Sequence, residues 1–400
     1  MALEGASQAP LPELSTLRDL PDFAELAASG RQRAAFGEAC ARAEAVLPGI
    51  TPELVMGCVV RLDRGFPAVT SERGTFRAEF AARLTKGRTG AGRSGAAGQT
   101  GEGSSRVAVG DWVCARVPEG HDMGLIEEIL PRESDIARWR GGSRGERQTL
   151  AANVGLVIVA QALGERPISC DRIARSAVIA RDCGAAFAVV LTKADRAPRE
   201  VLVSDVRLVR EVLGEDLRLV LTSSAAEREQ GNKAGELRGL ARDLEVAWGT
   251  DAVRALVPAG AVAIVLGESG AGKSTLLNAL LGTDLLETGA VREVDDMGRH
   301  TTVARRMVSV PGGGVIVDEP GLRSLPLVGH ERGLAMVFPH IAEAAANCRF
   351  RDCTHTHEPG CGVRAALAAG AFPEARLSCY LSLAAEMRES AGTLDPDVVL

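Results

Sequence analysis

The segment from residue 261 to residue 281 constrains the fold of this chain more than any other. An apolar run, AVAIVL, is followed by GESGAGKS and then by the helix-forming stretch TLLNALL. The middle part matches the pattern G-x-x-x-x-G-K-[ST] in full and stands between a strand and a helix, as a phosphate-binding loop must. Its glycines let backbone N–H groups turn toward phosphate oxygens, and the helix presents its positive end to the same anion. The sequence therefore predicts a P-loop nucleotide-binding domain of the α/β class.

The residues of this loop have expected roles. Lys273 should reach the β- and γ-phosphates and belongs to the predicted catalytic residues, and Ser274 should coordinate Mg²⁺. The loop alone does not choose the base or the reaction, because ATPases, kinases and GTPases all use it. The positions predicted to bind the nucleotide here are Gly267, Glu268, Ser269, Gly270, Ala271, Gly272, Lys273, Ser274 and Thr275.

A second motif, Asp318-Glu319-Pro320-Gly321, follows the apolar strand at 315–317. An Asp at a strand end can hold Mg²⁺ through water, and the N–H of a Gly just after it can sense the γ-phosphate. A D-x-P-G match alone usually marks a turn. Because this one ends a strand downstream of a phosphate loop, it predicts that Asp318 and Gly321 belong to the same site.

Two segments upstream of the phosphate loop predict that the base is guanine. The sequence TKAD at 192–195 follows a buried strand, as the N/T-K-x-D motif of GTPases does. Asp195 can accept hydrogen bonds from N1–H and the exocyclic amine of guanine, which adenine does not offer in that arrangement, and the stem of Lys193 can lie over the base. The usual first residue is Asn, so Thr192 is a departure that could weaken base affinity. After the next strand, TSSA resembles the segment whose backbone reads guanine O6. The predicted base-site residues are Thr192, Lys193, Ala194, Asp195, Ser223 and Ser224.

The order of these motifs is informative. In ordinary GTPases the phosphate loop comes first and the base-reading motifs come last, whereas here 192–195 and 222–225 precede 267–274. The same sheet forms if the ends of the chain are joined and the chain is reopened elsewhere. We therefore expect a circularly permuted GTPase domain with a mainly parallel sheet and helices on both faces. The expected strands are 154–160, 186–192, 217–221, 261–266 and 314–318.

The N-terminal third of the sequence has a different pattern of apolar residues and turn signals. Residues 1–52 are expected to be an extension with a helical stretch near 23–47. From 53 to 133, short β-type runs alternate with turn signals, which favours a small barrel with the OB-fold as the leading candidate. Residues 86–106 are rich in Gly, Ser and Thr and poor in apolar residues, so we favour an unpacked loop over an RNA-reaching one.

A cluster near the C-terminus predicts a metal site. Cys348, Cys353 and Cys361 lie within fourteen residues together with His355 and His357. Three thiolates and one imidazole suit a closed, tetrahedral structural zinc site with no position left for catalysis. The sequence leaves open which of the two histidines is the fourth ligand.

Other features exclude several classes of protein. The first 21 residues show no signal peptide, and the longest apolar runs are far shorter than the roughly 18 residues of a membrane helix. Nine cysteines, six of them scattered, do not form a disulfide framework. The net charge of −6 gives no overall attraction to nucleic acid, so RNA contacts must be local. We expect a cytoplasmic protein with no membrane contact.

Taken together, these segments resemble the circularly permuted GTPase family that acts on the small ribosomal subunit during its assembly (RsgA, also called YjeQ). The resemblance covers about residues 53–385. It also rests on four further stretches, which are VGDWV at 109–113, ILPR at 129–132, ANV at 152–154 and GRHTT at 298–302.

The resemblance implies more than the residues alone do. It implies an OB-fold RNA-binding domain at 53–133, a permuted GTPase domain at 134–335 and a zinc-binding C-terminal domain at 336–400. The family spacing favours His355 as the zinc ligand, giving one zinc per chain. It implies GTP hydrolysis to GDP that is stimulated by the small subunit and its rRNA, and we expect a monomer.

The stretch GRHTT resembles the first switch loop of the family. One of Thr301 and Thr302 should approach Mg²⁺ and the γ-phosphate, and the resemblance does not say which. Many GTPases place a water-orienting Gln where this chain has Leu322, which cannot orient water. His300 is the nearest candidate for that task, so His300, Thr301, Thr302 and Lys273 form the predicted catalytic set.

The main alternative function is an RNA-binding assembly module whose pocket binds GTP but hardly turns it over. Thr192, Glu319 and Leu322 leave room for it, whereas Asp195 argues against an ATP-dependent enzyme. A final feature is an arginine-rich segment between the predicted barrel and GTPase domain. Composition favours a solvated linker, yet we expect it to dock on rRNA together with the barrel. Its arginines are Arg132, Arg138, Arg140, Arg144 and Arg147.

Overall fold

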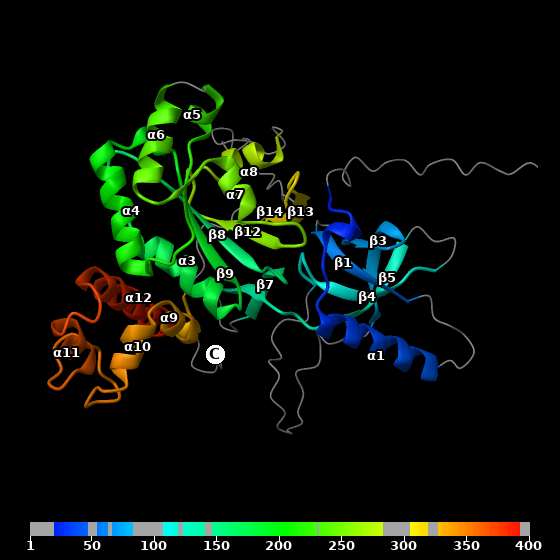
Figure 1. The fold of residues 1–400 in the computed structure, drawn as a ribbon. Coiled ribbons are helices and arrows are strands. Elements are labelled where there is room, and N and C mark those ends of the chain that lie inside the picture. Colours follow the sequence, from blue (N-terminus) through cyan, green and yellow to red (C-terminus); the bar gives the residue numbers. More distant parts are fainter. Residues whose placement is uncertain are drawn as a thin grey trace, which may run out of the picture.

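The computed structural model describes residues 20–46, 54–62, 66–82, 107–118, 123–140, 146–229, 232–282, 305–318 and 327–392. A β-barrel, a central α/β layer and a group of C-terminal helices follow one another across the molecule (Figure 1). The predicted loop at 86–106, the switch residues 298–302 and Gly321 lie outside the described residues. Among the helices that the structure describes, none combines the length and the apolar character needed to cross a membrane.

The central layer is a seven-stranded part of a larger sheet. Its order is β11-β10-β9-β8-β12-β14-β13, and every neighbouring pair is parallel except β13 with β14. The prediction of a mainly parallel sheet is therefore confirmed. The strands are β8 (Leu156–Ala162), β9 (Ala186–Thr192), β10 (Leu219–Leu221), β11 (Ala247–Trp248), β12 (Val262–Leu266), β13 (Arg305–Ser309) and β14 (Val315–Asp318).

Both faces of this sheet are buried, because successive residues of its strands enter two different hydrophobic clusters. Along β8, Val157 and Val159 belong to one cluster, while Leu156 and Ile158 belong to the other. The first cluster includes residues of α3 (Cys170–Asp182), α4 (Arg199–Leu213) and α6 (Asn232–Asp243). The second includes residues of α7 (Thr250–Ala255) and α8 (Lys273–Leu281). The predicted arrangement, with helices on both faces, is confirmed.

The N-terminal barrel closes on itself. It consists of β1 (Leu54–Leu62), β2 (Ala68–Ser71), β3 (Gly74–Phe80), β4 (Trp112–Arg116) and β5 (Met123–Ile129), paired in the order β1-β2-β3-β5-β4 with β4 returning to β1. The pairing of β3 with β5 is parallel and the others are antiparallel. This is the predicted OB-like barrel, although sequence reasoning missed β2. Strand β1 also pairs with β13, so barrel and central layer share one continuous sheet.

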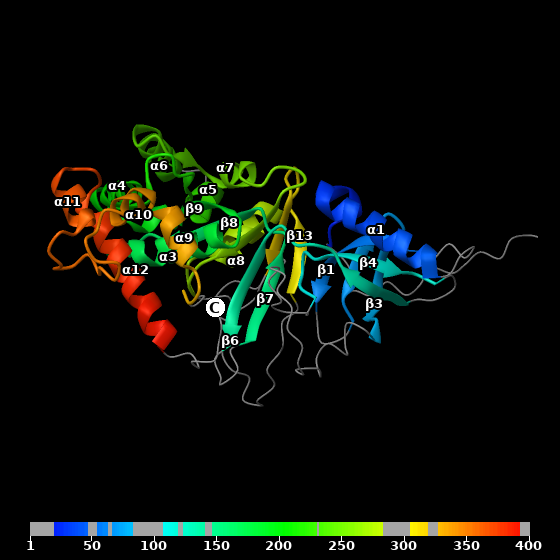
Figure 2. The same ribbon diagram turned by 90° about the horizontal axis from the view of Figure 1, so that it is seen from below.

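A two-stranded ribbon follows the barrel. Strands β6 (Asp135–Arg140) and β7 (Glu146–Ala152) pair antiparallel, and Figure 2 shows them between the barrel and the helices α9 and α12. Ile136 and Leu150 are fully buried at its base. Arg132 lies at the entrance, where its guanidinium binds both oxygens of the buried Asp111 at 2.7 and 2.8 Å. The arginine-rich segment is therefore a hairpin and not the solvated linker that its composition favours.

The N-terminal extension contacts both the barrel and the central layer. It contains a short turn, η2 (Phe23–Glu25), and the predicted helix, α1 (Gly30–Val46). Leu26 forms a parallel bridge with Gly260, while Phe23 packs edge-on against Trp112 of the barrel at 5.7 Å. Gln32 is 1% exposed and donates to the carbonyl of Pro131 and to the side chain of Asn153. Residues 20–46 thus contact both neighbouring parts of the molecule.

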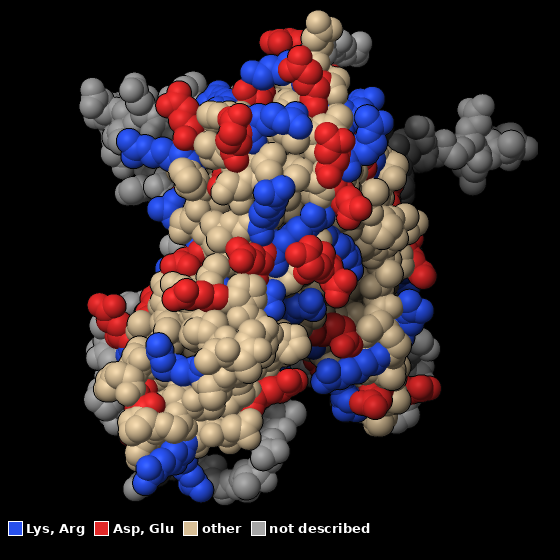
Figure 3. All heavy atoms as spheres, turned by 60° about the vertical axis from the view of Figure 1, so that its left-hand side comes forward, with Lys and Arg blue, Asp and Glu red and all other residues tan. Residues whose placement is uncertain are grey.

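The C-terminal helices pack against α3 and α4. They are α9 (Glu331–Val337), α10 (Pro339–Ala345), α11 (Gly362–Ala368) and α12 (Glu374–Gly392). Their core centres on Phe338, which is fully buried and stacks edge-on with Tyr380. The same hydrophobic cluster continues into the central layer, and α9 spans the boundary expected at residue 335. On the face seen in Figure 3, acidic and basic side chains are interspersed above, whereas the lower part, over these helices, is mostly uncharged.

Candidate nucleotide and metal sites

The phosphate loop has the backbone geometry that its glycines permit. Gly267, Gly270 and Gly272 have φ values of 154°, 80° and 82°, a region that side-chain-bearing residues rarely adopt. A Cβ on Gly267 would lie 2.4 Å from the carbonyl oxygen of Ala160 in β8, so only glycine fits there. The loop is therefore pressed against the neighbouring strand before α8 begins at Lys273.

The side chain of Lys273 folds back over this loop. Its ammonium group donates to the carbonyl oxygens of Gly267 and of Glu268, the latter at 2.7 Å. These carbonyls hold the positive charge at the loop, where a phosphate oxygen can exchange for them. Ser274 and Thr275 follow in the first turn of α8. Glu268 itself forms an exposed ion pair with Arg172 of α3 at 2.6 Å, a contact that sequence reasoning did not anticipate.

The D-x-P-G motif begins at the same edge of the sheet. Asp318 is the last residue of β14, which pairs in parallel with β12 and sets Val317 opposite Ile264. Because parallel neighbours end at the same edge, Asp318 lies beside the start of the phosphate loop. The structure therefore brings Asp318 and Ser274 to the same edge of the sheet, as the sequence predicts. Gly321 lies outside the described residues.

The TKAD segment braces the phosphate loop directly. The hydroxyl of Thr192 donates to the carbonyl of Ala271 at 2.7 Å, and the ammonium of Lys193 donates to the carbonyl of Gly270 at 2.5 Å. Lys193 adopts the left-handed conformation with φ of 57°, and burial lowers its pKa. Thr192 thus fastens the two loops together, a contact that the comparison with Asn had not suggested.

Asp195 faces the TSSA segment. The hydroxyl of Ser223 donates to Oδ1 of Asp195, and the backbone N–H of Ala194 donates to the carbonyl of Thr222 at 3.2 Å. Ser223 is 1% exposed and Asp195 is partly buried, so this contact is only partly open to water. Ser224 begins the short helix α5 (Ser224–Glu229). A carboxylate held in this way keeps further lone pairs for two donors, which matches the N1–H and amine edge of guanine.

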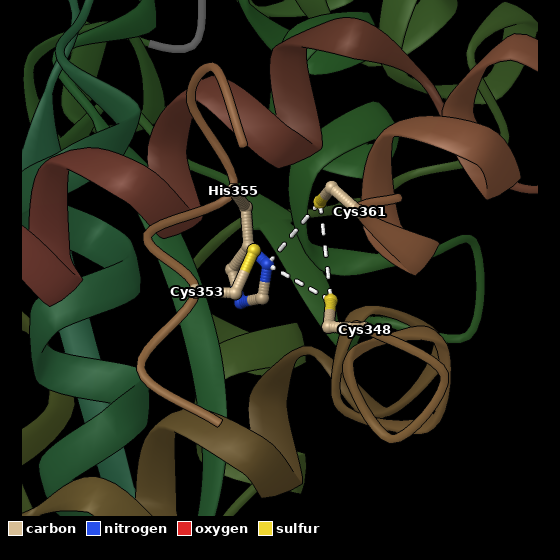
Figure 4. Close-up of side chains that lie close together, drawn as sticks. All are labelled: Cys348, Cys353, His355 and Cys361. Carbon is tan, nitrogen blue, oxygen red and sulfur yellow. Dashed lines mark hydrogen bonds between the residues drawn. The ribbon is translucent and has the colours of Figure 1, made fainter. Parts of the chain in front are cut away.

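The predicted metal ligands also come together. The thiols of Cys348, Cys353 and Cys361 and a ring nitrogen of His355 all lie within 4.8 Å of one another (Figure 4). Nδ1 of His355 is 3.5 Å from the sulfurs of Cys348 and Cys361, which are 3.9 Å apart. A tetrahedral zinc with bonds of about 2.3 Å to sulfur and about 2.0 Å to nitrogen places its ligands about 3.5 to 3.8 Å apart. The cluster therefore fits a Cys₃His metal site.

The loop around His355 is built to present that ring. His355 has φ of 63°, which His tolerates better than most residues. The carboxylate of Glu358 accepts from the backbone N–H groups of Thr354, Thr356 and His357 at 2.8, 3.1 and 3.2 Å. Hydrogen bonds from the hydroxyl and the backbone N–H of Thr354, together with the backbone N–H of His357, hold the pKa of Glu358 well below its usual range. His357 turns its Nδ1 to the hydroxyl of Thr356 instead of to the cluster.

Backbone N–H groups also point at the cluster's sulfurs. Gly362 donates to Cys348 at 3.3 Å and Arg364 donates to Cys361 at 3.5 Å. Burial alone would raise the pKa of Cys348, but hydrogen bonds from Val363, Gly362 and the neighbouring thiols outweigh it and lower that pKa. A lowered thiol pKa favours the thiolate, which is the form that binds metal.

The fold and these sites define a class of protein, which is a P-loop GTPase with its motifs in circularly permuted order. The strand carrying TKAD precedes the strand of the phosphate loop in the chain, yet both end at one edge of the same sheet. Of the predicted site residues, His300, Thr301, Thr302 and Gly321 lie outside the described residues. All the other predicted site residues lie within the described residues.

Comparison with known proteins identifies the family. The model of the RsgA GTPase family matches residues 129–328. The chain is 39% identical over 349 residues to the small ribosomal subunit biogenesis GTPase RsgA of Streptomyces coelicolor, with 87% of this chain and 84% of that protein covered. It is 35% identical to the protein of the same name from Leptospira interrogans, with 76% and 78% covered. The chain therefore belongs to the RsgA GTPase family, and the resemblance seen in the sequence is confirmed.

Solved structures agree on the fold. YjeQ from Thermotoga maritima superposes with a TM-score of 0.58 at 21% identity, covering 84% of this chain and 99% of that chain. YloQ, described as a circularly permuted GTPase, gives a TM-score of 0.55 at 17% identity, covering 84% and 96%. At these identities the likeness supports the permuted fold and leaves residue roles to be argued from this chain.

Proposed function

We propose that this protein is a GTPase that binds the small ribosomal subunit and acts in its biogenesis, hydrolysing GTP to GDP and phosphate with stimulation by the subunit. The observation that carries the nucleotide part is the contact of Thr192 and Lys193 with Ala271 and Gly270. It sets the base-reading loop and the phosphate loop side by side, as one nucleotide bound by both loops requires. The ribosomal part follows from the names of the relatives.

We assign the following roles to the residues of this site. The backbone of Gly267–Thr275 and the ammonium of Lys273 bind the phosphates, Ser274 and Asp318 hold Mg²⁺, and Asp195 reads the base. Mg²⁺ held by Ser274 and Asp318 would supply positive charge that stabilises the phosphates during hydrolysis. His300 orients the attacking water, while Thr301 and Thr302 complete the switch and Gly321 senses the γ-phosphate.

The C-terminal cluster binds one zinc ion through Cys348, Cys353, Cys361 and Nδ1 of His355. The ligand spacing given above supports zinc, and the four protein ligands leave no open position, so the metal's role is structural. It joins the loop that follows α10 to the start of α11, where Cys361 is the N-cap, and it thereby fixes these two helices relative to each other. The OB-like barrel and the hairpin β6–β7 contact rRNA, and the protein acts as a monomer in the cytoplasm, where ribosomal subunits assemble.

Multiple-turnover GTP hydrolysis with and without purified small subunits tests the main proposal. We expect stimulation by the subunit, and the Lys273→Ala variant should show none above background. Hydrolysis that stays near zero under both conditions would favour the module that binds GTP without turning it over. ATP competing as well as unlabelled GTP would remove the guanine assignment.

The hairpin provides a test of the rRNA contact. Arg138, Arg140 and Arg147 belong to its two strands, whereas Arg132 is committed to Asp111 and is left intact. Replacing the three hairpin arginines by Ala should weaken binding to small subunits and flatten its salt dependence, because each phosphate contact contributes to that slope.

A matched control removes the same charge elsewhere. Arg207, Arg218 and Arg238 are exposed on the α4 and α6 side of the central layer. Their triple Ala variant should bind subunits as the unmodified protein does. Equal binding and equal salt slopes for both triple variants would show that the hairpin does not dock on rRNA.

A further inference from the structure

We propose that Glu227 is a positioning residue for guanine recognition, because its carboxylate fixes the loop that orients Asp195. The inference rests on the assignment of Asp195 to the base, made above. Glu227 lies in the first turn of α5, four residues after Ser223. It belongs to none of the motifs that the sequence singled out.

The carboxylate of Glu227 collects three donors from two segments. Oε1 accepts from the hydroxyl of Thr222 at 2.7 Å and from the backbone N–H of Ser223 at 3.3 Å. Oε2 accepts from the backbone N–H of Thr250 at 2.9 Å, at the start of α7. Gly249, directly before Thr250, has φ of 92°, a backbone conformation that favours glycine. Glu227 thus ties the base-reading loop to a helix 23 residues away.

The loop held in this way carries the group that holds Asp195. The hydroxyl of Ser223 donates to Oδ1 of Asp195 and accepts from the backbone N–H of Ala226 at 3.2 Å. Thr222 and Ser223 are each 1% exposed, so water cannot readily replace a lost partner. The path from Glu227 to the base therefore has two steps, first to Thr222 and Ser223 and then to Asp195.

Both carboxylate oxygens are needed for this arrangement. A glutamine in the same rotamer offers one oxygen acceptor, and its amide would point N–H groups at a donor on one side. Glu227→Gln should therefore keep one half of the contact and lose the other. The exposed Glu229, two residues further along α5, has the same charge and serves as a matched control.

The readout must separate orientation of Asp195 from general support of the fold. Guanine and hypoxanthine differ by the exocyclic amine, which is one of the two donors that Asp195 binds. Loosening Asp195 should weaken the binding of GDP more than the binding of IDP. Because only folded protein binds either nucleotide, the ratio of the two dissociation constants does not change when part of the protein is unfolded. Loss of about one hydrogen bond to a charged group corresponds to about a tenfold change in that ratio.

The experiment measures binding of GDP, IDP and ADP to the full-length protein by calorimetry. In Glu227→Ala the preference for GDP over IDP should fall about tenfold, in Glu227→Gln by less, and in Glu229→Ala not at all. If the Ala variant does not fold, the Gln variant alone carries the test. Equal losses for GDP and IDP, or an unchanged ratio, would overturn the inference while leaving guanine binding in place. An unmodified protein that binds ADP as well as GDP would overturn the proposed function and this inference with it.

Discussion

The contact between α3 and α9 is a point where one substitution should loosen the C-terminal helices from the central layer. Asp182 ends α3, and its carboxylate is 2.8 Å from Nδ1 of His330 and 3.1 Å from the backbone N–H of Gly333. The side chains of Asp182 and His330 are 17% and 8% exposed. Arg332 adds a longer contact at 3.4 Å, but it is 70% exposed. Asp182→Ala would leave two nearly buried donors without an acceptor.

The magnitude follows from these contacts. Hydrogen bonds to a charged group contribute about 1.5 to 3 kcal/mol each, and two that share one carboxylate do not add fully. The exposed pair with Arg332 contributes little. We therefore expect Asp182→Ala to lower the free energy of opening α9 by about 3 kcal/mol. Amide hydrogen exchange of residues 331–337 measures this local opening, and exchange there should be about a hundredfold faster.

The effect should depend on pH with a defined sign. Burial alone would raise the pKa of Asp182, but the hydrogen bond and charge of His330, together with Arg332, outweigh it and lower that pKa. A carboxyl whose pKa is lower in the folded state stabilises that state above its unfolded pKa of about 3.9 and loses the effect as pH falls through the folded pKa. The difference between wild type and variant should therefore be full at neutral pH and shrink below about pH 4.

The control for this variant is an exposed carboxylate. Asp243 forms a 3.9 Å pair with Arg199 in which both side chains are 64% exposed, so Asp243→Ala should change exchange in α9 by nothing measurable. Exchange in α9 of Asp182→Ala at the wild-type rate would refute the reasoning. A difference that stays the same from pH 7 to pH 3 would refute its electrostatic part.

Three further predictions concern the nucleotide and metal sites. Asp195→Asn should weaken GTP binding at least about tenfold and improve binding of xanthine nucleotides, whose C2 carbonyl can accept from the amide; competition binding measures both. Lys273→Ala should lower hydrolysis by about a hundredfold or more at any metal concentration, whereas the defect of Ser274→Ala should shrink as Mg²⁺ is raised; equal metal dependence would contradict the assignment of Ser274. Cys353→Ser should abolish the one zinc per chain found by metal analysis and loosen α10 and α11, while GTP affinity changes little.

The nucleotide-binding site was largely predictable because its signals are local. The phosphate loop needs its strand, its glycines and its helix within about twenty residues, and all three are contiguous in the sequence. Asp195 and Asp318 were recognisable because each ends a buried strand, and parallel strands end at one edge. The metal cluster was equally local, since its spacing within fourteen residues already limits the ligands.

Contacts between distant segments were not predictable from pattern. Gln32 donates a hydrogen bond to Asn153, which lies 121 residues further along the chain. Its burial was not predictable, because nothing in the sequence distinguishes it from an exposed polar residue near the start of a helix. The arginine-rich hairpin was also not predictable. Its many charged residues indicate a solvated segment, and only two residues, Ile136 and Leu150, are the buried ones that anchor it. Glu227 lies in an ordinary helical turn, and only the fold shows that Thr250 is its partner.

The permuted order brings the nucleotide edge of the sheet close in sequence to the C-terminal helices, which the α3–α9 contact fastens to the central layer. The chain leaves Asp318 at the nucleotide edge and reaches α9 at Glu331. Only twelve residues of sequence separate these two points, so the connection from the nucleotide edge to the C-terminal helices is short. Gly333 lies so close to α3 that a Cβ there would be 2.2 Å from the carbonyl oxygen of Val178, and Asp182 binds its N–H. Helix α9 is therefore packed tightly against α3, and the hydrogen bond from Gly333 to Asp182 is part of that contact.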